Sequence, residues 1–362
     1  MLYASDAVAV SPVFGEVRGR AAIADTWQRL FATLGEVVVE VSDLLVDGDR
    51  VAVMSTVETT DLTGWFGLPA TGRAIRYRLV LLLTTKGGQI VRDERLYDST
   101  GVLERLEKAR VDKELRTAAD VQRALSPRAA HVGPFFESVG DSIPCRAIGG
   151  DFFEFVDLPN GDASIVMGDV SGKGPPAALL AAMLQGMLAV EAPECRGPAD
   201  TLTRVNRQLA ARRLEPRFAT VVYGVLSRDG RFTYANAGHN PPAALTRNGV
   251  RRLTIGGPIL GVFAEARFEE ETLQLSPDDI LMMFTDGVTE ARNGAGDEFG
   301  EDRLIRSLDS GTGAPLSSVL AGVFAAVRTF CQDAAQSDDI TVTATRFRAA
   351  PGDDDRTATG GN

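Results

Sequence analysis

Four aspartates, each at the end of an apolar run or beside glycine, constrain the fold of this chain more than any other feature. They are Asp151, Asp169, Asp286 and Asp338, in this order along the C-terminal part of the sequence. Buried strands typically end at such positions, because glycine permits a sharp turn of the backbone. A carboxylate beside a core strand is costly to desolvate unless it is paired or bound to metal. The motifs are Ile148–Phe155, Gly168–Gly174, Phe284–Ala291 and Ser337–Thr341.

A single Asp-Gly pair is more often a turn than a site, and Asp47-Gly48 and Asp229-Gly230 are interpreted as turns. For any one of the four aspartates, a turn and a metal ligand are about equally good interpretations. For the set, a metal site is the better interpretation, because oxygen ligands that converge from several strand ends suit Mg²⁺ or Mn²⁺. The sequence therefore predicts a metal centre built from carboxylates.

The composition is that of a globular protein, with 44% hydrophobic and 24% charged residues among 362, a length that allows two domains. The net charge of -11 argues against nucleic acid as the main partner, since binding to a phosphate backbone requires clustered Lys and Arg. His131 and His239 are the only histidines, so a histidine-rich zinc site cannot form. Catalysis would have to use carboxylates and metal.

The three cysteines, Cys145, Cys195 and Cys331, are odd in number and form no Cys-X-X-Cys pair, which indicates a reducing cytosol. Met1 is not followed by a basic and apolar leader, and no stretch approaches the roughly 20 apolar residues of a membrane span. We therefore expect a cytoplasmic protein with no membrane and no nucleic-acid partner.

The N-terminal part of the chain is predicted to be a helix packed on an antiparallel sheet. Apolar spacing indicates a helix over Ala21–Leu34, closed by Gly35. Asp47-Gly48-Asp49 and Lys86-Gly87-Gly88 are hairpin signals between strand-like runs. Those runs are Val37–Val46, Val51–Thr60, Ile75–Thr85 and Ile90–Tyr97.

Residues 1–101 resemble the cone-shaped α+β fold of SnoaL-like polyketide cyclases and nuclear-transport-factor-2-like domains, most clearly over Gly72–Ile75 and Gly88–Glu94. Such domains usually have a further helix before this point, which the cone either lacks or has upstream of Met1. Because fold constrains function weakly, we expect a sensory or dimerising domain rather than an enzyme. Side chains that could line a small-molecule pocket, or simply fill the cone, are Trp65, Phe66, Tyr77, Asp93, Glu94, Tyr97 and Asp98.

Residues 102–127 are predicted to be a helical linker between two domains. Leu103–Leu125 contains good helix formers and ends shortly before a proline. Val111, Ala118 and Leu125 recur every seven residues, which allows a parallel two-helix coiled coil and hence a homodimer. About two heptads are fewer than the three to four that identify a coiled coil, so a single helix packed on a neighbour is the alternative.

The chain from about Val111 to Arg348 resembles the SpoIIE-like and RsbU-like branch of the metal-dependent (PPM-type) protein phosphatases, and the phosphatase domain itself is expected over residues 128–348. The resemblance rests on the four aspartate motifs, their order and their intervals, together with three further segments. It implies an αββα sandwich, in which two sheets stack between helices and two Mn²⁺ or Mg²⁺ ions lie at one end. The further segments are Ala119–Pro127, Asn236–Pro242 and Gly257–Gly261.

The same resemblance implies a role for each acid. Asp169 would bridge both ions, with the Val170 carbonyl on one of them. Asp286 and Asp338 would complete the shell of the other ion, and Asp151 would act on the first, directly or through water. A supporting position behind the metal ligands is expected for Glu290 and Asp339.

Other residues near the motifs depart from the family pattern or have two interpretations. Lys173 stands where histidine is common and replaces no presumed ligand. Ser171 stands where eukaryotic relatives have a histidine general acid, so water or the surroundings of the substrate would protonate the leaving group. His239 is expected to hold a loop in place rather than to contact phosphate. Arg146 and Arg217 could neutralise the substrate phosphate or could simply be solvated.

Three further segments carry expectations about regulation and order. Pro175–Leu184 reads as a helix that begins close to Asp169, and we expect it to couple the linker to the active site. Asn293–Gly300 could be a flap over the site or a simple connector. Residues 349–362 are expected to be a disordered tail.

The sequence thus predicts a cytoplasmic serine/threonine phosphatase that uses two Mn²⁺ or Mg²⁺ ions and acts on a phosphorylated signalling protein. The family resemblance suggests a STAS-type anti-sigma-factor antagonist as this partner. Two ions in such a site would hold a water, lower its pKa towards about 7 and neutralise the phosphoryl oxygens. Two alternatives stay open. One is a catalytically silent ligand-binding scaffold, and the other is a nucleotide cyclase, because Gly149–Phe153 superficially resembles the GGDEF signature of diguanylate cyclases.

Overall fold

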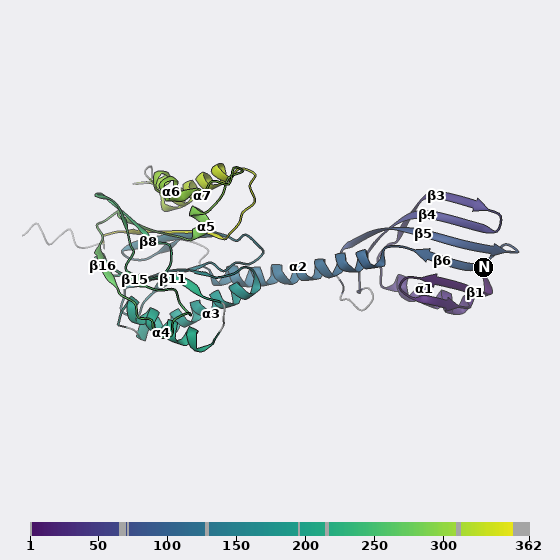
Figure 1. Ribbon diagram of the computed structural model, residues 1–362, viewed down its shortest axis with the longest axis horizontal. Coiled ribbons are helices and arrows are strands. Elements are labelled where there is room, and N and C mark those ends of the chain that lie inside the picture. Colours follow the sequence, from purple (N-terminus) through teal and green to yellow (C-terminus); the bar gives the residue numbers. More distant parts are fainter. Residues whose placement is uncertain are drawn as a thin grey trace, which may run out of the picture. The chain divides into compact units, whose positions relative to one another are not determined.

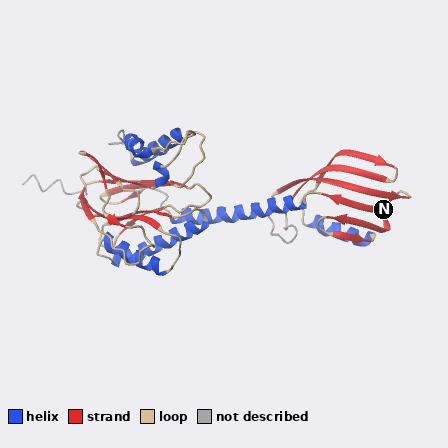
Figure 2. Ribbon diagram, in the orientation of Figure 1, coloured by secondary structure: helices blue, strands red, loops and turns tan. Residues whose placement is uncertain are grey.

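The chain folds into two compact units, Met1–Glu114 and Leu115–Asn362. The computed structural model describes residues 2–64, 70, 72–126, 130–194, 196–213, 217–308 and 313–349. Their helices and strands are drawn in Figures 1 and 2. The division between the units falls inside the helix that the sequence predicts as a linker. Trp65 and Phe66, Cys195 and most of the predicted tail lie outside the described residues.

The first unit contains a six-stranded sheet with the strand order β2-β1-β6-β5-β4-β3. β1 and β6 pair in parallel, and the other neighbours pair antiparallel. Gly48, Gly87 and Gly88 have positive φ at the two predicted hairpin turns. The elements are β1 (Tyr3–Ser11), β2 (Gly15–Arg18), α1 (Arg20–Ala32), β3 (Val38–Asp47), β4 (Arg50–Thr60), β5 (Ala74–Lys86) and β6 (Gln89–Leu96).

The helix and four strands predicted for this unit are confirmed, with ends that differ by no more than two residues. β1 and β2 were not predicted. The side chains that β1 buries against Ile23 of α1 include Ala7 and Ala9, which carry little apolar signal in the sequence. A second small core joins Leu34 and Ile75 to the start of the next helix.

Several of the predicted pocket residues of this unit bind other side chains or the backbone. Asp93 is 1% exposed and accepts a hydrogen bond from the Tyr3 hydroxyl at 2.5 Å. It also forms an ion pair at 3.0 Å with Arg95, whose guanidinium lies 3.6 Å from the ring centroid of Trp27. Asp98 accepts a hydrogen bond from the backbone N–H of Gly101 in the first turn of the following helix. Tyr77 and Tyr97 have ring centroids 5.5 Å apart, and Glu94 lies 3.6 Å from Arg92.

The following helix, α2 (Ser99–Leu125), starts four residues before the predicted helix and ends where predicted. Its first turns bury Val102 and Leu106 in the core of the first unit. Val111 and Leu125, two of the heptad positions, have exposed fractions of 40% and 48%. Apolar side chains are thus available on the surface of α2, and the coiled coil stays a prediction.

The second unit is a sandwich of two six-stranded sheets between two layers of helices (Figure 1). One sheet has the order β15-β12-β11-β10-β9, with β16 paired to β12, and the other has the order β14-β13-β17-β18-β8-β7. The predicted αββα architecture is confirmed. Strands of the first sheet are β9 (Phe152–Asp157), β10 (Ala163–Val170), β11 (Ala219–Leu226), β12 (Arg231–Ala237), β15 (Gly256–Gly257) and β16 (Glu271–Gln274). Strands of the second are β7 (His131–Val132), β8 (Phe136–Ile143), β13 (Ala243–Thr246), β14 (Gly249–Arg252), β17 (Ile280–Phe284) and β18 (Ile340–Phe347).

Three apolar layers hold the sandwich together. α3 (Pro175–Glu191) and α4 (Pro198–Ala211) pack on the first sheet, and α6 (Gly300–Leu308) and α7 (Leu316–Cys331) pack on the second. The third layer lies between the sheets. β10 is buried on both faces, since Val166 belongs to the helix-facing layer and Met167 to the layer between the sheets. The remaining elements are the short helices η1 (Ala192–Glu194) and α5 (Asp286–Thr289).

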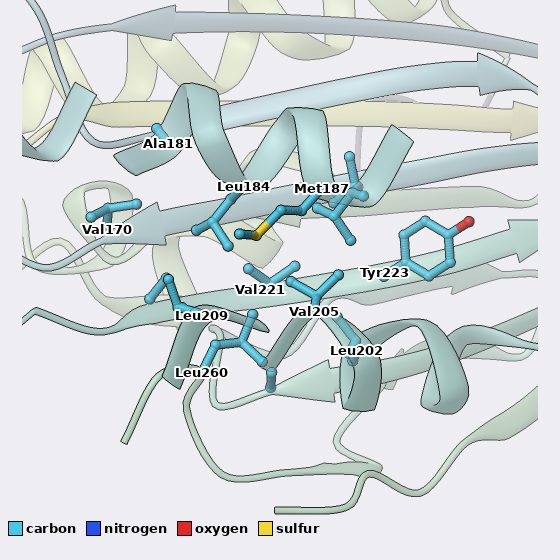
Figure 3. Close-up of a cluster of buried hydrophobic side chains, with 14 of the residues drawn as sticks. Val170, Ala181, Leu184, Met187, Leu202, Val205, Leu209, Val221, Tyr223 and Leu260 are labelled. Carbon is cyan, nitrogen blue, oxygen red and sulfur yellow. The ribbon is translucent and has the colours of Figure 1, made fainter. Parts of the chain in front are cut away.

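The apolar helix α3 corrects one expectation from the sequence. By length and composition alone, the 20 residues Pro175–Glu194, which comprise α3 and η1, could cross a membrane, with a mean hydropathy of 1.3 over an 18-residue window. The expectation that no stretch approaches such a span is therefore wrong. The helix packs in the core, where its side chains Leu184 and Met187 point towards Val205 of α4 and Val221 of β11 (Figure 3). Burial between a helix and a sheet accounts for its composition.

Substitutions on opposite sides of α3 should have opposite effects on stability. Leu184 is fully buried, so Leu184→Ala should lower the free energy of unfolding of the second unit by about 2–5 kcal/mol. Gly186 is exposed and has no atom within 4 Å of an added methyl group, so Gly186→Ala should raise it by up to about 1 kcal/mol. Urea denaturation followed by far-UV circular dichroism measures both changes.

Tryptophan fluorescence provides an internal control for these two variants. Both tryptophans, Trp27 and Trp65, belong to the first unit. Their unfolding signal should stay at the native midpoint in both variants. An equal loss of stability in Leu184→Ala and Gly186→Ala would contradict the packing described for α3.

Candidate metal centre

The four predicted aspartates lie at strand ends that the two sheets bring to one place. In the first sheet, Gly168 of β10 pairs with Phe152 of β9, so Asp169 of β10 lies near Asp151, the residue that precedes β9. In the second sheet, β17 and β18 pair through Phe284, so Asp286 follows one strand while the Asp338-Asp339 pair precedes the other. β10 and β17 are mostly buried and apolar, and the short helix α5 begins at Asp286.

Asp151 connects the two sheets. Its Oδ2 accepts hydrogen bonds from the Thr285 hydroxyl at 2.8 Å and the Thr341 hydroxyl at 2.6 Å, and both threonines come from the second sheet. The Thr341 backbone N–H in turn donates to Thr285 Oγ1 at 3.1 Å. Both threonine side chains are fully buried, so the carboxylate of Asp151 is held by neutral donors in the interior.

Asp339 fixes the backbone around the acids. One carboxylate oxygen accepts the backbone N–H of Cys145 and the other accepts that of Gly150, each at 2.8 Å. The side chain is 4% exposed. Because both oxygens are engaged by the protein, the geometry agrees with the supporting position expected for Asp339. Glu290, the other residue expected in support, is exposed.

Burial and mutual repulsion raise the pKa values of the gathered acids. Burial raises the pKa of Asp151 well above its ordinary value, and the negative charge of Asp169 raises it further. Burial likewise raises the pKa of Asp169 from 3.8 to about 6, with Asp286 adding to the effect. For Asp286 the causes are burial and then the charge of Asp338. Bringing these acids together therefore costs folding free energy when no cation is bound among them.

Positive side chains border the acids on one side. Lys173 Nζ lies 2.9 Å from Asp338 Oδ2 and donates to the carbonyl of Ser337. The guanidinium of Arg146 is 3.9 Å from the position that a methyl group on Gly174 would take, and that of Arg217 is 3.3 Å from the corresponding position on Gly172. The loop after Val170 is thus flanked by three cations. Cys145 lies here as well, with its sulfur within 4.8 Å of carboxylate oxygens of Asp338 and Asp339.

Two glycines allow the backbones of the acid-bearing loops to touch. A methyl group on Gly287 would come within 1.9 Å of the Asp339 carbonyl oxygen. One on Gly150 would come within 2.7 Å of the Val170 carbonyl oxygen, the atom that the family resemblance implies as a ligand. Only glycine fits at either contact, because a real Cβ does not approach backbone so closely.

His239 has the structural surroundings expected of it. Its backbone is held by the Asn236 side chain, which accepts from the His239 N–H at 2.7 Å and donates to its carbonyl at 2.9 Å. Its ring Nδ1 lies 2.9 Å from the hydroxyl of Thr220, the residue paired with Asp169 in the neighbouring strand. Burial lowers the pKa of His239 to about 4, so the ring is neutral near pH 7.

Sequence reasoning missed several residues of this site. Thr285 and Thr341 lie inside the aspartate motifs, yet their hydroxyl groups give no signal of a partner 134 or 190 residues away. The carboxamide of Gln122 on α2 hydrogen-bonds Gly149, two residues before Asp151.

Asn293–Gly300, the candidate flap, is a turn in which the Asn293 side chain accepts hydrogen bonds from the backbone N–H groups of Ala295 and Asp297.

Removal of one acid should stabilise the metal-free chain. The pKa of Asp169 is raised in the folded state, so the native chain binds a proton more tightly than the unfolded chain, and its stability falls as pH rises from about 4 to about 6. Asp169→Asn should raise the thermal midpoint at pH 7.5 by roughly 2–4 °C for each kcal/mol of repulsion relieved. It should also flatten this pH dependence. Thermal denaturation in the presence of a chelator measures both.

Asp229→Asn is the matched control, because Asp229 lies in an exposed turn beside Arg231. Its thermal midpoint and pH dependence should stay close to those of the native chain. A metal-free Asp169→Asn chain that melts below the native chain would contradict the repulsion described here.

Two family models match the chain. The model described as "Stage II sporulation protein E (SpoIIE)" matches residues 159–348, and the model of the SnoaL-like domain matches residues 1–93. The first match contains Asp169, Asp286 and Asp338 and begins after Asp151. The second covers the sheet and helix of the first unit up to Asp93.

Curated relatives and a solved structure resemble the C-terminal part of the chain. Protein IcfG of Synechocystis is 32% identical over 195 residues, which are 46% of this chain and 31% of that protein. Phosphoserine phosphatase RsbU of Bacillus subtilis is 29% identical over 185 residues, which are 50% of this chain and 55% of that protein. The chain therefore matches about half or less of these relatives. The SiaA-PP2C domain of Pseudomonas aeruginosa superimposes with a TM-score of 0.59 at 21% identity, over 67% of this chain and 98% of that domain, and thus shares its fold.

Proposed function

Because the chain belongs to the Stage II sporulation protein E (SpoIIE) family, we propose that residues 128–348 form a metal-dependent phosphatase domain that removes phosphate from serine or threonine of a partner protein. The observation that carries the proposal is the meeting of Asp151, Asp169, Asp286 and Asp338 at one end of the sandwich. The name of the RsbU relative, a phosphoserine phosphatase, supports the same chemistry.

The donor atoms at the site fit hard divalent cations. They are carboxylate oxygens and a backbone carbonyl, the ligands that Mg²⁺ and Mn²⁺ prefer. Burial and repulsion raise the pKa values of Asp151, Asp169 and Asp286, and a cation bound among them would offset that cost. We propose two ions, with Asp169 between them. Asp286 and Asp338 would hold one ion, and Asp151 and the Val170 carbonyl would hold the other.

When bound, such ions would supply positive charge for the phosphoryl oxygens and a water of lowered pKa, so that no phosphoenzyme is needed. The protein's own groups would keep the acids in place and receive the substrate. Thr285 and Thr341 orient Asp151 without neutralising it. Arg146 and Arg217 stand beside the loop after Val170, where their guanidinium groups could pair with a phosphate. The charged groups that bind substrate are thus distinct from those that bind metal.

The partner is proposed to be a phosphorylated STAS-type anti-sigma-factor antagonist, on the strength of the family resemblance. The SnoaL-like unit would bind a small molecule or hold two chains together as a homodimer. Exposed apolar residues support an interaction surface: Val38, Val39, Val41, Leu44, Leu45 and Val46 all lie on the edge strand β3. A cytoplasmic location belongs to the same proposal.

Release of phosphate tests this function directly. The intact chain should release phosphate from phosphorylated STAS proteins when Mn²⁺ is present and should stop when a chelator is added. Asp169→Asn should lower the rate of phosphate release by at least about 100-fold. That factor is the upper end of the effect expected for groups that only support metal ligands. Asp229→Asn, in an exposed turn, should keep native activity. Malachite-green detection of phosphate measures the rates, and circular dichroism confirms that each variant is folded.

Two results would replace this function with one of its rivals. A folded chain that binds Mn²⁺ but releases no phosphate from any phosphoserine protein would favour the silent scaffold. Formation of a cyclic dinucleotide from GTP would favour the cyclase.

In the structure Gly149-Gly150 precedes β9 and contacts Asp339, which gives the glycines a role in the acid cluster and weakens the likeness to a cyclase signature.

A further inference from the structure

The carboxamide of Gln122 binds both backbone polar groups of one residue, Gly149, beside the acid cluster. Its Nε2 donates to the Gly149 carbonyl at 2.7 Å, and its Oε1 accepts the Gly149 N–H at 3.2 Å. Both hydrogen-bonding groups of this residue are therefore satisfied by one side chain. Gln122 lies in the last turns of α2, in the part of the helix that belongs to the second unit.

Gly149 begins the segment that carries Asp151. The next residue, Gly150, donates its N–H to Asp339 at 2.8 Å, and Asp151 then bonds the two threonines. Two consecutive glycines have wide conformational freedom, so external hydrogen bonds must choose the direction of the backbone here. A methyl group on Gly149 would lie 2.2 Å from Asp339 Oδ2, which shows how closely the segment passes the carboxylate.

The surroundings of Gln122 are open rather than densely packed. A cavity of about 920 Å³ lies between the end of α2, β8 and α7. Gln122, Gly149 and Asp151 all line it, together with apolar side chains such as Phe324. The end of α2 therefore meets the acid-bearing segment through a polar contact at the edge of a cavity.

We propose that Gln122 is a positioning residue for Asp151, and that its contact with Gly149 raises the affinity of the site for divalent cations. When Gln122 binds Gly149, the segment Gly149–Asp151 is fixed and Asp151 is ready to receive a cation. Without this contact, the two glycines lose a restraint and the affinity falls. The inference rests on the proposed function for the identity of the cation.

The sequence predicts that α3 couples the linker to the active site, and this coupling stays a prediction. Leu180, the position on α3 that would carry such a signal, is 4% exposed in the core, so a charge there would disturb folding itself. Gln122 makes its contact with the acid-bearing segment directly. It can therefore be changed without opening the core.

Binding of Mn²⁺ to the intact chain tests the inference without relying on catalysis. Gln122→Met keeps the length of the side chain but makes no hydrogen bonds. It should raise the dissociation constant for Mn²⁺ about 10-fold, which is the lower end of the effect of groups that orient metal ligands. Gln122→Asn stays polar but cannot span the distance, and it should weaken binding similarly. Isothermal titration calorimetry measures both. At saturating Mn²⁺, kcat on a phosphoprotein should return to within about twofold of native, because the acids themselves are unchanged.

The neighbouring variant Arg123→Met is the matched control. Arg123 also lines the cavity, and its side chain pairs with Asp120 on the same helix. It should bind Mn²⁺ as the native chain does. Native affinity in folded Gln122→Met and Gln122→Asn would overturn the inference, and so would equal weakening by Arg123→Met. A native chain that binds no Mn²⁺ would overturn both proposals, whereas one that binds it without hydrolysing any phosphoprotein would overturn the proposed function alone.

Discussion

The rest of the structure depends on one contact, in which two threonine hydroxyls from the second sheet hold the buried carboxylate of Asp151 from the first. Neutral donors fix the position of the acid and leave its charge uncompensated. An arginine in their place would form a buried ion pair and fill the site with its own cation. The sandwich is therefore closed at this end by a contact that keeps negative charge available.

The other acids follow from this arrangement. Both carboxylate oxygens of Asp339 accept hydrogen bonds from backbone N–H groups. These bonds connect the loop before β18 to the segments at Cys145 and Gly150. Asp169 and Asp286 are then held near Asp151, and their pKa values are raised. This arrangement lowers the stability of the fold but provides the ligands for a cation. Lys173 forms an ion pair with Asp338 at 2.9 Å. The same few side chains thus lower the stability of the fold and favour the binding of a cation.

Much of the fold could be predicted from local sequence, and the reasons are physical. The hairpin at Gly48 and the strands around it follow from glycine's positive φ and the alternation of side chains. The aspartates could be grouped because each stands at or near one end of a strand. β1 escaped prediction because the residues it buries include alanines of weak apolar signal. The partners of Asp151 and Gly149 could not be found, since contacts between distant segments leave no periodic trace in one sequence.

Gly287 shows what such packing imposes on the gene. Its backbone touches the Asp339 carbonyl so closely that no other amino acid can be accommodated without separating the two loops. A survey of tolerated codons would rank this position with the acids themselves, although it has no side chain to offer to a reaction. Intolerance to change at Gly287 would mark the shape of the cluster, and a reader of such a survey who looked only for reactive groups would pass over it.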